Sequence, residues 1–514
     1  MNRDYLFKQV YDYVLHRIEL NEWKENEKLP SIRNLAAEMK VHRLTVLKAY
    51  QHLKQENKVY VKDKSGYYVQ SCEINKIESL ENPIVSAYVQ KNHLSEIHQV
   101  PVSYQFSQAL IDPNLLPNRF ISDYVKKVFD LYPKVLSTYS TVQGDHELRQ
   151  SLSDYFNQHY KTITHPDELL ITAGSQQAIH LIAQAFVKSR DTILLERPSY
   201  SSAIDIFRAQ GANIVSVDIH PYGYDLEQIE FIMKKHKPRL FYLNPTFHNP
   251  TGYTVPSAQR KQLVQLAEQY RCLLIEDDAY YDIFFDQEPP PPMYTYDTSS
   301  MVIYIKSFCK YVSPGLRIAV MMNGQSSVMK SLLAVKSLAD NGSPLLNQKI
   351  FLHYFSSPRL QQHVEKLRIA LQIRKEIMEK ELSVTDWQWT SPNGGLNLWV
   401  QLPDRLSTED LLVKSLEQSI SFVPGQICDP LKEPSSWLRL SYSYANEEQI
   451  SEGLRKFINL RSTQKGVASR KCGFTTLRKF QYKENSRIGE PLRAKTEACC
   501  TYFPISLKSP IFLY

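Results

Sequence analysis

The sequence predicts an α/β protein whose main sheet is mostly parallel, preceded by a smaller helical module. Two observations lead to this prediction. From about residue 104 onward, short apolar segments alternate with helical stretches, and such alternation favours a parallel sheet covered by helices. Within the first 70 residues, three helical stretches precede a segment in which apolar and polar residues alternate.

Length and composition agree with a globular protein of two or three domains. The chain has 514 residues, of which 43% are hydrophobic and 22% are charged, and a domain commonly takes about 100–200 residues. We find no apolar run that predicts a membrane span and no signal peptide at the N-terminus. The seven cysteines form no C-x-x-C pair, so we expect reduced thiols, no metal site and a cytoplasmic location.

The net charge of +7 is unevenly distributed along the chain. Residues 1–70 hold four more Lys and Arg than Asp and Glu, and residues 463–514 hold seven more. The part between them is therefore slightly acidic, and we expect a polyanion to bind the N-terminal module. The basic tail over 463–514 shows no apolar period, so we expect it to be disordered, and its residues indicate no function.

The first 70 residues predict three helices and a β-hairpin. Apolar residues recur every four positions over 5–20, which indicates a helix. Ser31 is suited to cap a second helix over 32–39. A third helix is expected over 42–55, and the alternation over 59–69 indicates the hairpin. This is the layout of a winged helix-turn-helix, whose third helix enters the major groove of DNA.

Three segments of this module resemble the GntR-type DNA-binding domain. They are Leu29-Pro30-Ser31-x-Arg33, Val41-x-Arg43-x-Thr45-Val46 and Gly66-Tyr67-Tyr68-Val69. The resemblance implies that Arg33 binds a phosphate and that Arg43 and Thr45 lie near bases or backbone. Together with basic residues of the third helix and the hairpin, the expected DNA-binding set is Arg33, Arg43, Thr45, Lys48 and Lys64.

The module departs from the GntR pattern at two positions. Lys40 stands where the family usually has a glycine in the turn, and Asn57 replaces another glycine. Asparagine tolerates a left-handed backbone, whereas Lys40 at positive φ would cost roughly 1 kcal/mol, so we expect the turn to differ locally. The alternative to a DNA-binding module is a helical dimerisation module with a solvated basic face.

The large domain is expected over 104–462 and is joined to the module of residues 1–70 by an exposed connector. Residues 71–103 indicate this connector because they show no sustained apolar period. Seven apolar segments of the large domain predict strands: 168–172, 192–196, 213–218, 240–244, 273–276, 302–305 and 317–322. Ligands bind such sheets beyond the carboxyl ends of the strands, so the residues that follow these segments are the candidate site residues.

The strand expected over 302–305 leads directly to Ser307, Lys310 and Arg317. One lysine, one hydroxyl and one guanidinium in a single loop suit a phosphorylated aldehyde. The lysine can form a Schiff base, and the other two groups can hold the phosphate. Taken alone, the segment could also be a strand end followed by a solvated basic turn.

Two other segments suit an aromatic ligand that carries a phosphate. Ser175 and Gln176 open a helix after a strand, where free backbone N–H groups and the helix dipole bind phosphate. Tyr200 follows the next strand and can stack on an aromatic ring. The ordinary alternatives are a plain helix start and a core aromatic residue.

Two further segments suit a pyridine ring with a phenolic oxygen. Asn249 can hydrogen-bond a phenolate oxygen, and Tyr280 can donate to the same oxygen. A carboxylate at Asp277, or less favourably at Asp278, keeps a pyridine nitrogen protonated and makes the ring an electron sink. The alternative for the acidic pair is a solvated loop.

These segments together resemble the cofactor site of fold-type I aminotransferases that use pyridoxal phosphate (PLP), a fold with a large and a small subdomain. The resemblance implies that the phosphate is held by Ser175, Gln176, Ser307 and Arg317, with Tyr139 reaching it across a dimer interface. It implies that Tyr200 stacks on the ring, Asn249 and Tyr280 contact its O3′, Asp277 pairs with its nitrogen, Lys310 is linked to its aldehyde, and Arg439 binds a substrate α-carboxylate.

A GntR-type module fused to an aminotransferase-like domain is the architecture of the MocR family of transcriptional regulators, which this sequence resembles. The resemblance implies a homodimer that binds operator DNA and uses PLP, with or without an amine or amino acid, as effector. The main alternative is a working aminotransferase, since residual transamination is chemically possible. A PLP-binding scaffold that does not contact DNA is a third alternative.

Overall fold

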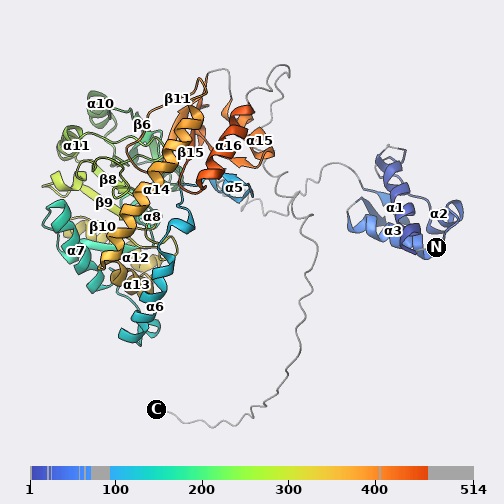
Figure 1. Ribbon diagram of the computed structural model, residues 1–514, viewed down its shortest axis with the longest axis horizontal. Coiled ribbons are helices and arrows are strands. Elements are labelled where there is room, and N and C mark those ends of the chain that lie inside the picture. Colours follow the sequence, from blue (N-terminus) through green and yellow to red (C-terminus); the bar gives the residue numbers. More distant parts are fainter. Residues whose placement is uncertain are drawn as a thin grey trace, which may run out of the picture. The chain divides into compact units, whose positions relative to one another are not determined.

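The computed structural model of the chain describes residues 3–460 except 20, 21, 25, 57, 63, 64, 71–92 and 404–406. Lys64, most of the expected connector and the basic tail at 463–514 therefore lie outside the described residues. The chain divides between residues 91 and 92 into two compact units, each of which is described by itself (Figure 1). No described helix is long and apolar enough to cross a membrane.

The N-terminal unit has the predicted order of three helices and a hairpin. It consists of α1 (Arg3–Glu19), α2 (Ile32–Glu38), α3 (Arg43–Gln55), β1 (Val59–Lys62) and β2 (Gly66–Val69). The Ser31 hydroxyl accepts a hydrogen bond from the Asn34 backbone N–H (3.1 Å) and so caps α2 as expected. The apolar stripe of α1, including Val10 and Val14, packs with Val46 of α3 in a shared core.

The turn between α2 and α3 keeps a left-handed residue at the position where Lys40 replaces glycine. Lys40 has φ +52°, so the expectation that the turn would differ locally is wrong. Two hydrogen bonds close the end of α2, from the Val41 N–H to the Ala36 carbonyl and from the Lys40 N–H to the Ala37 carbonyl. These two hydrogen bonds form a Schellman motif. They stabilise the left-handed conformation of Lys40, which costs roughly 1 kcal/mol for a residue other than glycine.

All seven strands predicted for the large domain are present in one sheet. They are β4 (Leu169–Thr172), β5 (Thr192–Arg197), β6 (Asn213–Asp218), β7 (Leu240–Leu243), β8 (Leu273–Asp278), β9 (Val302–Ser307) and β10 (Ala319–Met322). Their order is β4-β10-β9-β8-β7-β5-β6, and only β10 runs antiparallel to its neighbours. The prediction of a mainly parallel α/β sheet is therefore confirmed.

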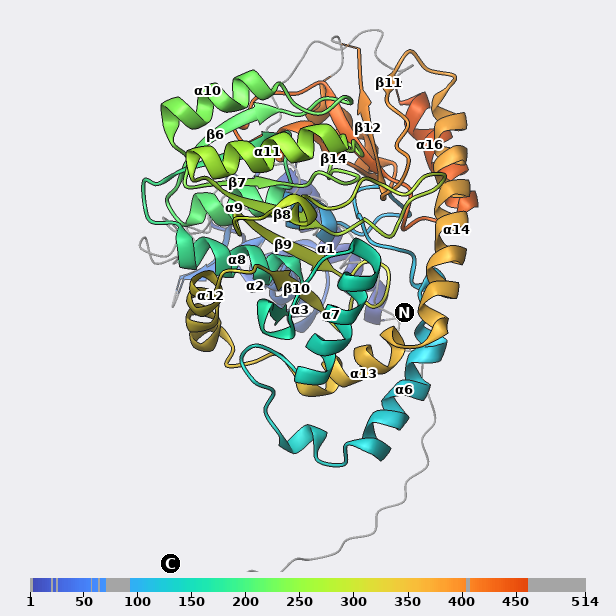
Figure 2. The ribbon, with the colours of Figure 1, turned by 90° about the vertical axis from the view of Figure 1, so that its left-hand side faces the viewer.

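Helices cover both faces of this sheet (Figure 2). One face packs against α8 (Ser175–Phe186), α9 (Ser201–Ala209) and α12 (Ser326–Ala339), and the other packs against α10 (Leu226–His236) and α11 (Ser257–Tyr270). Neighbouring strand residues alternate between the two cores, as Leu195 and Leu194 show. Both faces are buried, which explains why these strands are continuously apolar in sequence.

The rest of the unit holds a smaller sheet and further helices. The small sheet is antiparallel, in the order β11 (Gln388–Trp389), β12 (Asn397–Gln401), β15 (Trp437–Ser441) and β14 (Val423–Pro424), and β3 (Tyr104–Gln105) pairs with β13 (Ile420–Ser421). The helices are α5 (His93–Gln99), α6 (Asn118–Leu131), α7 (His146–Tyr160), α13 (Leu345–Phe355), α14 (Pro358–Leu382), α15 (Thr408–Glu417) and α16 (Glu447–Asn459). Short 3-10 turns are η1 (Pro113–Leu115), η2 (Val135–Ser137), η3 (Pro166–Glu168), η4 (Met293–Tyr296) and η5 (Gly425–Cys428).

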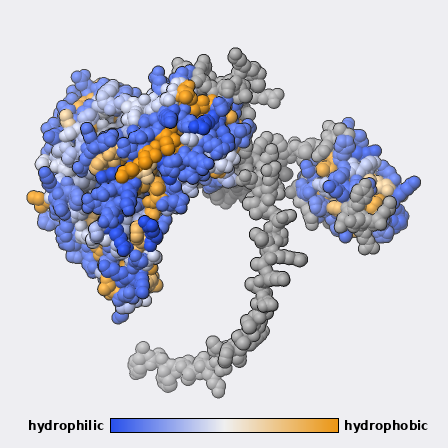
Figure 3. Space-filling view, in the orientation of Figure 1, coloured by the Kyte–Doolittle hydropathy of each residue, from blue (hydrophilic) through white to orange (hydrophobic). Residues whose placement is uncertain are grey.

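Two features of this unit go beyond the sequence prediction. Helix α5 lies inside the range expected to be a connector, and its Ile97 is fully buried in the large core. The surface visible in Figure 3 is mostly hydrophilic but carries an elongated apolar band along α14, where Ile369 and Ile373 are 62% and 46% exposed. The end of the expected connector thus packs as part of the large unit.

The strand directions gather the candidate residues at one edge of the sheet. Every strand except β10 ends at this edge. Strand β10 begins there, and its Ala319 pairs with both Thr172 and Ser307. The residues just after β4, just after β9 and just before β10 therefore meet at one corner of the edge.

Candidate cofactor site and nucleic-acid interface

The corner between β4, β9 and β10 forms a cradle suited to a phosphate. Ser175 is the first residue of α8, and its N-cap is Gly174, so no side chain occupies the first backbone N–H groups of the helix. The Arg317 guanidinium donates from Nη2 to the Ala173 carbonyl (2.9 Å). A Cβ at Gly174 would lie 2.4 Å from that Nη2. Only glycine therefore lets the guanidinium reach the helix N-terminus, where an anion is stabilised.

The other residues expected at the phosphate differ in exposure. Ser307 is buried at the end of β9, and its hydroxyl accepts a hydrogen bond from the Cys309 N–H (3.4 Å). Gln176 and Arg317 are exposed. The fold thus brings together a hydroxyl, a guanidinium and a helix N-terminus at this corner.

Asp277 is a buried carboxyl with one oxygen left unused. The Tyr242 hydroxyl donates to its Oδ2 (2.7 Å), whereas Oδ1 has no hydrogen-bond partner among the described residues. Burial raises the pKa of Asp277 to about 7. A buried polar atom without a partner is costly, and a charged N–H donor would both satisfy Oδ1 and restore the carboxylate. A protonated pyridine nitrogen is such a donor, so this residue fits the PLP ring.

Its neighbour Asp278 is already fully engaged. It accepts hydrogen bonds from the Tyr304 hydroxyl (2.6 Å) and from the backbone N–H groups of Tyr280 and Tyr281, and it lies 3.5 Å from Lys306 Nζ. No acceptor of Asp278 is left buried and unused among the described residues. Of the two acidic residues, Asp277 is therefore the one available to a ligand.

Lys310 lies in the turn after β9 and is half-buried. Its Nζ donates to the Ala109 carbonyl (3.0 Å). Burial lowers the pKa of Lys310 to about 8, with Arg439 and Arg317 lowering it further and Asp277 opposing them. These interactions place the amine among the other candidate residues. Because the amine is the nucleophile toward an aldehyde, a lowered pKa increases the fraction of lysine that can react near neutral pH.

Arg439 and Asn249 form one buried polar pair. The Arg439 guanidinium donates from Nη1 to the Asn249 Oδ1 (2.9 Å) and from Nη2 to the Ser107 carbonyl, and its Nε has no partner among the described residues. Hydrogens on all three nitrogens remain unused, which suits a carboxylate. Because Asn249 uses its carbonyl for Arg439, its amide N–H₂ is the part left for a phenolate oxygen.

The remaining predicted residues lie in different settings. Tyr200 is half-buried, and burial raises the pKa of its hydroxyl. The charges of Asp277, Arg439 and Arg317 also affect this pKa, so Tyr200 lies near these three residues. Tyr280 is 2% exposed, and burial raises its pKa as well, with Arg439 opposing this rise. Tyr139, in contrast, is 89% exposed, so the chain's own fold does not enclose it.

Several groups at this site were missed in the sequence. Tyr242 donates a hydrogen bond to Asp277. The feature that could have identified it in the sequence is a hydroxyl-bearing residue within an apolar strand. Asn244 ties the site together, because its side chain donates to the Asp277 carbonyl and accepts from the Asn249 N–H (2.7 Å). The carbonyls of Ser107 and Ala109 left no signal, since every residue has a carbonyl and only the fold brings these two to the site.

The N-terminal unit presents its predicted DNA-binding residues at the surface. Arg33 on α2 and Arg43 and Lys48 on α3 are exposed, and Thr45 is half-buried. Leu44, which the sequence reasoning did not select, is 60% exposed in the first turn of α3. It lies one turn from Lys48, on the same face of the helix.

Comparisons with known proteins assign both units. A family model described as "Aminotransferase class I and II" matches residues 123–457. A second, described as "Bacterial regulatory proteins, gntR family", matches residues 6–69.

Individual relatives fall into two groups. The 2-aminoadipate transaminase of Thermus thermophilus is 32% identical over 369 residues, covering 71% of this chain and 91% of that protein. The Bacillus subtilis protein named "Uncharacterized HTH-type transcriptional regulator YdfD" is 28% identical over 464 residues, covering 87% of this chain and 94% of that protein. The match to the regulator thus extends over both units.

One solved structure resembles the large unit in both fold and sequence. It is LysN, an α-aminoadipate aminotransferase from Thermus thermophilus complexed with N-(5′-phosphopyridoxyl)-L-leucine, with a TM-score of 0.68 and 31% identity over 72% of this chain and 95% of that chain. The chain therefore belongs to the class I and II aminotransferase family and, with its GntR-type module, is a DNA-binding transcriptional regulator of the MocR type that uses PLP.

Proposed function

We propose that this chain regulates transcription as a homodimer, and that an amino compound bound in the PLP site sets the affinity of the N-terminal modules for DNA. The observation that carries the proposal is Asp277 Oδ1, which has no partner among the described residues and is buried in the same cluster as the Lys310 amine, beside a cradle for phosphate. When bound, PLP supplies an aldehyde that reacts with amines and a ring that withdraws electrons.

The chain's own groups have separate tasks in this proposal. The first turn of α8 binds the phosphate together with Ser307 and Arg317. Asp277 is ionised and holds a proton on the ring nitrogen, while the amide of Asn249 donates to O3′. Tyr280 would donate to the same oxygen, Tyr200 would stack on the ring, and Lys310 would provide the amine for covalent attachment.

Arg439 makes the site respond to amino acids rather than to amines alone. Its unused hydrogens bind an α-carboxylate, and Asn249 holds the guanidinium in place. Both groups are buried, so water competes weakly for the guanidinium. A ligand that makes this contact in only one arrangement of the protein shifts the balance between arrangements, typically by about 1–3 kcal/mol.

Exposed residues of the large unit support the homodimer. Tyr139 is 89% exposed, and the nearby Leu136 and Leu131 are 70% and 55% exposed. In the proposed dimer these apolar side chains are covered by the partner, and Tyr139 reaches the partner's phosphate. Two N-terminal modules then read two half-sites of one operator.

The test is a gel retardation experiment on the DNA upstream of the chain's own coding sequence. The full chain is assayed with and without PLP and with a panel of amino acids. We expect retardation, and at least one amino acid should change the DNA affinity by about 5- to 150-fold. Arg439→Gln should bind the same DNA without that response. Equal affinity under all conditions would contradict the proposal.

A second candidate function is transamination. It is favoured by the complete set of Lys310, Asp277 and Arg439 and by the similarity to a transaminase. The assay is conversion of an amino acid and a keto acid by the cofactor-loaded chain. Rapid multiple turnover without DNA retardation would support the enzyme, whereas slow or absent turnover with retardation would support the regulator.

A further inference from the structure

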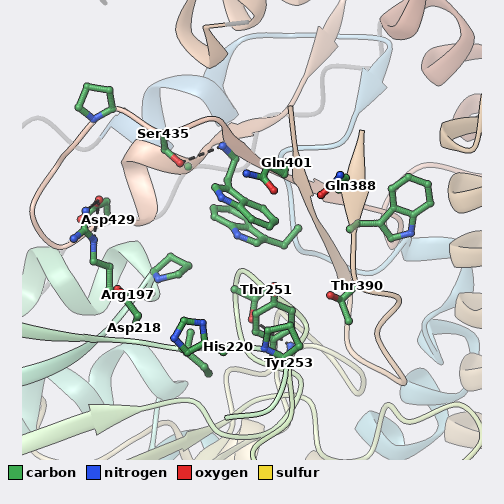
Figure 4. A pocket seen from close by; sticks show the side chains of 18 residues that line it. Arg197, Asp218, His220, Thr251, Tyr253, Gln388, Thr390, Gln401, Asp429 and Ser435 are labelled. Atoms are coloured by element: carbon green, nitrogen blue, oxygen red, sulfur yellow. Dashed lines mark hydrogen bonds and ion pairs between the residues drawn. The ribbon is translucent and has the colours of Figure 1, made fainter. Parts of the chain in front are cut away.

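A cavity of about 510 Å³ lies between the large sheet and the small sheet. Its floor comes from the loops after β5 and β6 and from residues 251 and 253, and its roof comes from the small antiparallel sheet. In Figure 4, Gln388, Gln401 and Ser435 lie on one side of the space, with His220, Thr251 and Tyr253 opposite. None of the residues expected to bind PLP lines this cavity.

Aromatic rings make up much of the wall. Trp399 and Trp437 stack nearly parallel, with ring centroids 5.8 Å apart and an angle of 8° between planes. Trp389 also lines the cavity, and its Nε1–H donates to Glu379 (3.2 Å), which fixes the ring. Tyr253 and His220 face the cavity from loops that follow strands of the large sheet. The faces of such rings carry negative potential and attract cations.

The charges at the cavity favour the same kind of ligand. Arg197 donates from Nε (3.2 Å) and Nη2 (3.0 Å) to Asp429 Oδ2, and its Nη2 also donates to Glu433. This group of one guanidinium and two carboxylates therefore has a net charge of −1. Asp218, at the end of β6, is exposed and lines the cavity, and its carboxylate has no hydrogen bond or ion pair among the described residues. The charged residues at this cavity therefore carry an excess of negative charge, which disfavours an anion.

We propose that this cavity binds an organic cation with an alkylated ammonium group, held by the aromatic faces and balanced by Asp218. The volume is within the usual range for small-molecule sites, roughly 300–1,000 Å³. Arg197 at the end of β5 ties the loop over 428–433 to the large sheet. Arg208 on α9 also holds this loop, by donating to the Pro430 carbonyl (2.8 Å). A ligand here touches both sheets at that junction, so it can alter how the small sheet sits on the large one.

The test compares two ligands that differ by one charge. Choline and 3,3-dimethylbutan-1-ol have the same shape, but the second has carbon in place of the charged nitrogen. Choline has no N–H bond and cannot condense with an aldehyde, so its binding does not report on the PLP site. Binding to the full-length, cofactor-loaded protein is followed by saturation-transfer NMR of the methyl protons.

We expect choline to bind and the neutral alcohol to bind at least several-fold more weakly. Asp218→Asn should weaken choline binding by roughly fivefold, the weight of one partly exposed charge contact. Tyr253→Leu should weaken it by a similar factor. Asp130→Asn, which removes an exposed carboxylate on α6 away from the cavity, should leave it unchanged.

Three results would overturn the proposal: no saturation transfer to choline, equal transfer to the alcohol, or a choline affinity that Asp218→Asn does not alter. Equal transfer to both ligands would identify an apolar site without cation selectivity. Because DNA retardation and its response to amino acids are measured in a separate assay, a failure here leaves the proposed function standing.

Discussion

The cofactor site and the DNA-binding module use opposite means to prepare for their ligands. At the cofactor site, polar groups are buried without partners, since Asp277 Oδ1 and Arg439 Nε have no hydrogen bond within the part of the chain that the structure describes. On the N-terminal unit, Arg33, Arg43 and Lys48 are exposed. A buried polar group without a partner costs free energy until its ligand binds. An exposed cation is hydrated, so its unbound state costs little free energy. The first arrangement favours one small molecule, and the second favours any polyanion of suitable shape.

The strongest test of this contrast is Asp277→Asn. The substitution keeps the size of the side chain and an acceptor for Tyr242 but removes the negative charge. We expect PLP affinity to fall at least roughly 100-fold, since the protonated ring nitrogen would lose its buried counter-ion. Absorbance titration of the apoprotein with PLP measures this loss. An affinity within threefold of wild type would contradict the assignment of Asp277.

The same substitution should stabilise the apoprotein at alkaline pH. The pKa of Asp277 is raised to about 7 in the folded chain, from about 4 in the unfolded chain. The folded state therefore holds this proton between about pH 4 and 7 while the unfolded state has lost it, so stability falls as the pH rises through that window. Asp277→Asn removes this fall in the free energy of unfolding, which amounts to roughly 4 kcal/mol at most.

Thermal unfolding of the two apoproteins at pH 5 and pH 8 provides the measurement. The melting temperature of Asp277→Asn should exceed that of wild type by more at pH 8 than at pH 5. Glu276 also has a pKa raised to about 7 by burial and contributes equally to both proteins, so the difference isolates Asp277. A difference that does not change with pH would show that Asp277 stays ionised when folded.

On the N-terminal unit the effects should be smaller and should depend on salt. Arg43→Ala should weaken operator binding by roughly 5- to 150-fold, because an arginine at a base edge contributes about 1–3 kcal/mol of discrimination. Lys48→Ala should weaken all DNA equally and lower the slope of log affinity against log salt by about 1. Salt-dependent fluorescence anisotropy with specific and random DNA separates the two roles. Unchanged binding by Arg43→Ala would favour the alternative of a helical dimerisation module.

The smallest expected effect concerns Leu44. An exposed leucine in the first turn of α3 can contact the C5-methyl group of a thymine. Replacing operator thymines with deoxyuridine, one at a time, removes that methyl. At one position wild type should lose affinity by roughly fourfold, the weight of one buried methyl group, while Leu44→Ala should not. Equal losses in both proteins at every position would show that Leu44 does not read the DNA.

The sequence predicted the seven strands of the main sheet because each is a continuous apolar segment buried on both faces. It did not predict that β10 runs antiparallel, since strand direction depends on how distant segments meet. It also predicted the wrong outcome at Lys40, because the two Schellman hydrogen bonds that hold the turn come from the folded backbone. The contact between Arg439 and Asn249 joins residues 190 positions apart, and no local pattern reveals such a pair.

The lysine that carries PLP can be identified by covalent labelling, and this measurement decides whether Lys310 has the proposed role. The full chain is loaded with PLP, reduced with borohydride to fix the covalent link, digested and analysed by mass spectrometry. Lys306 is an internal control, because it is fully buried four residues earlier and paired with Asp282 (2.8 Å) and Asp278 (3.5 Å). We expect the phosphopyridoxyl group on Lys310. A label on Lys306, or on no lysine of this segment, would contradict it.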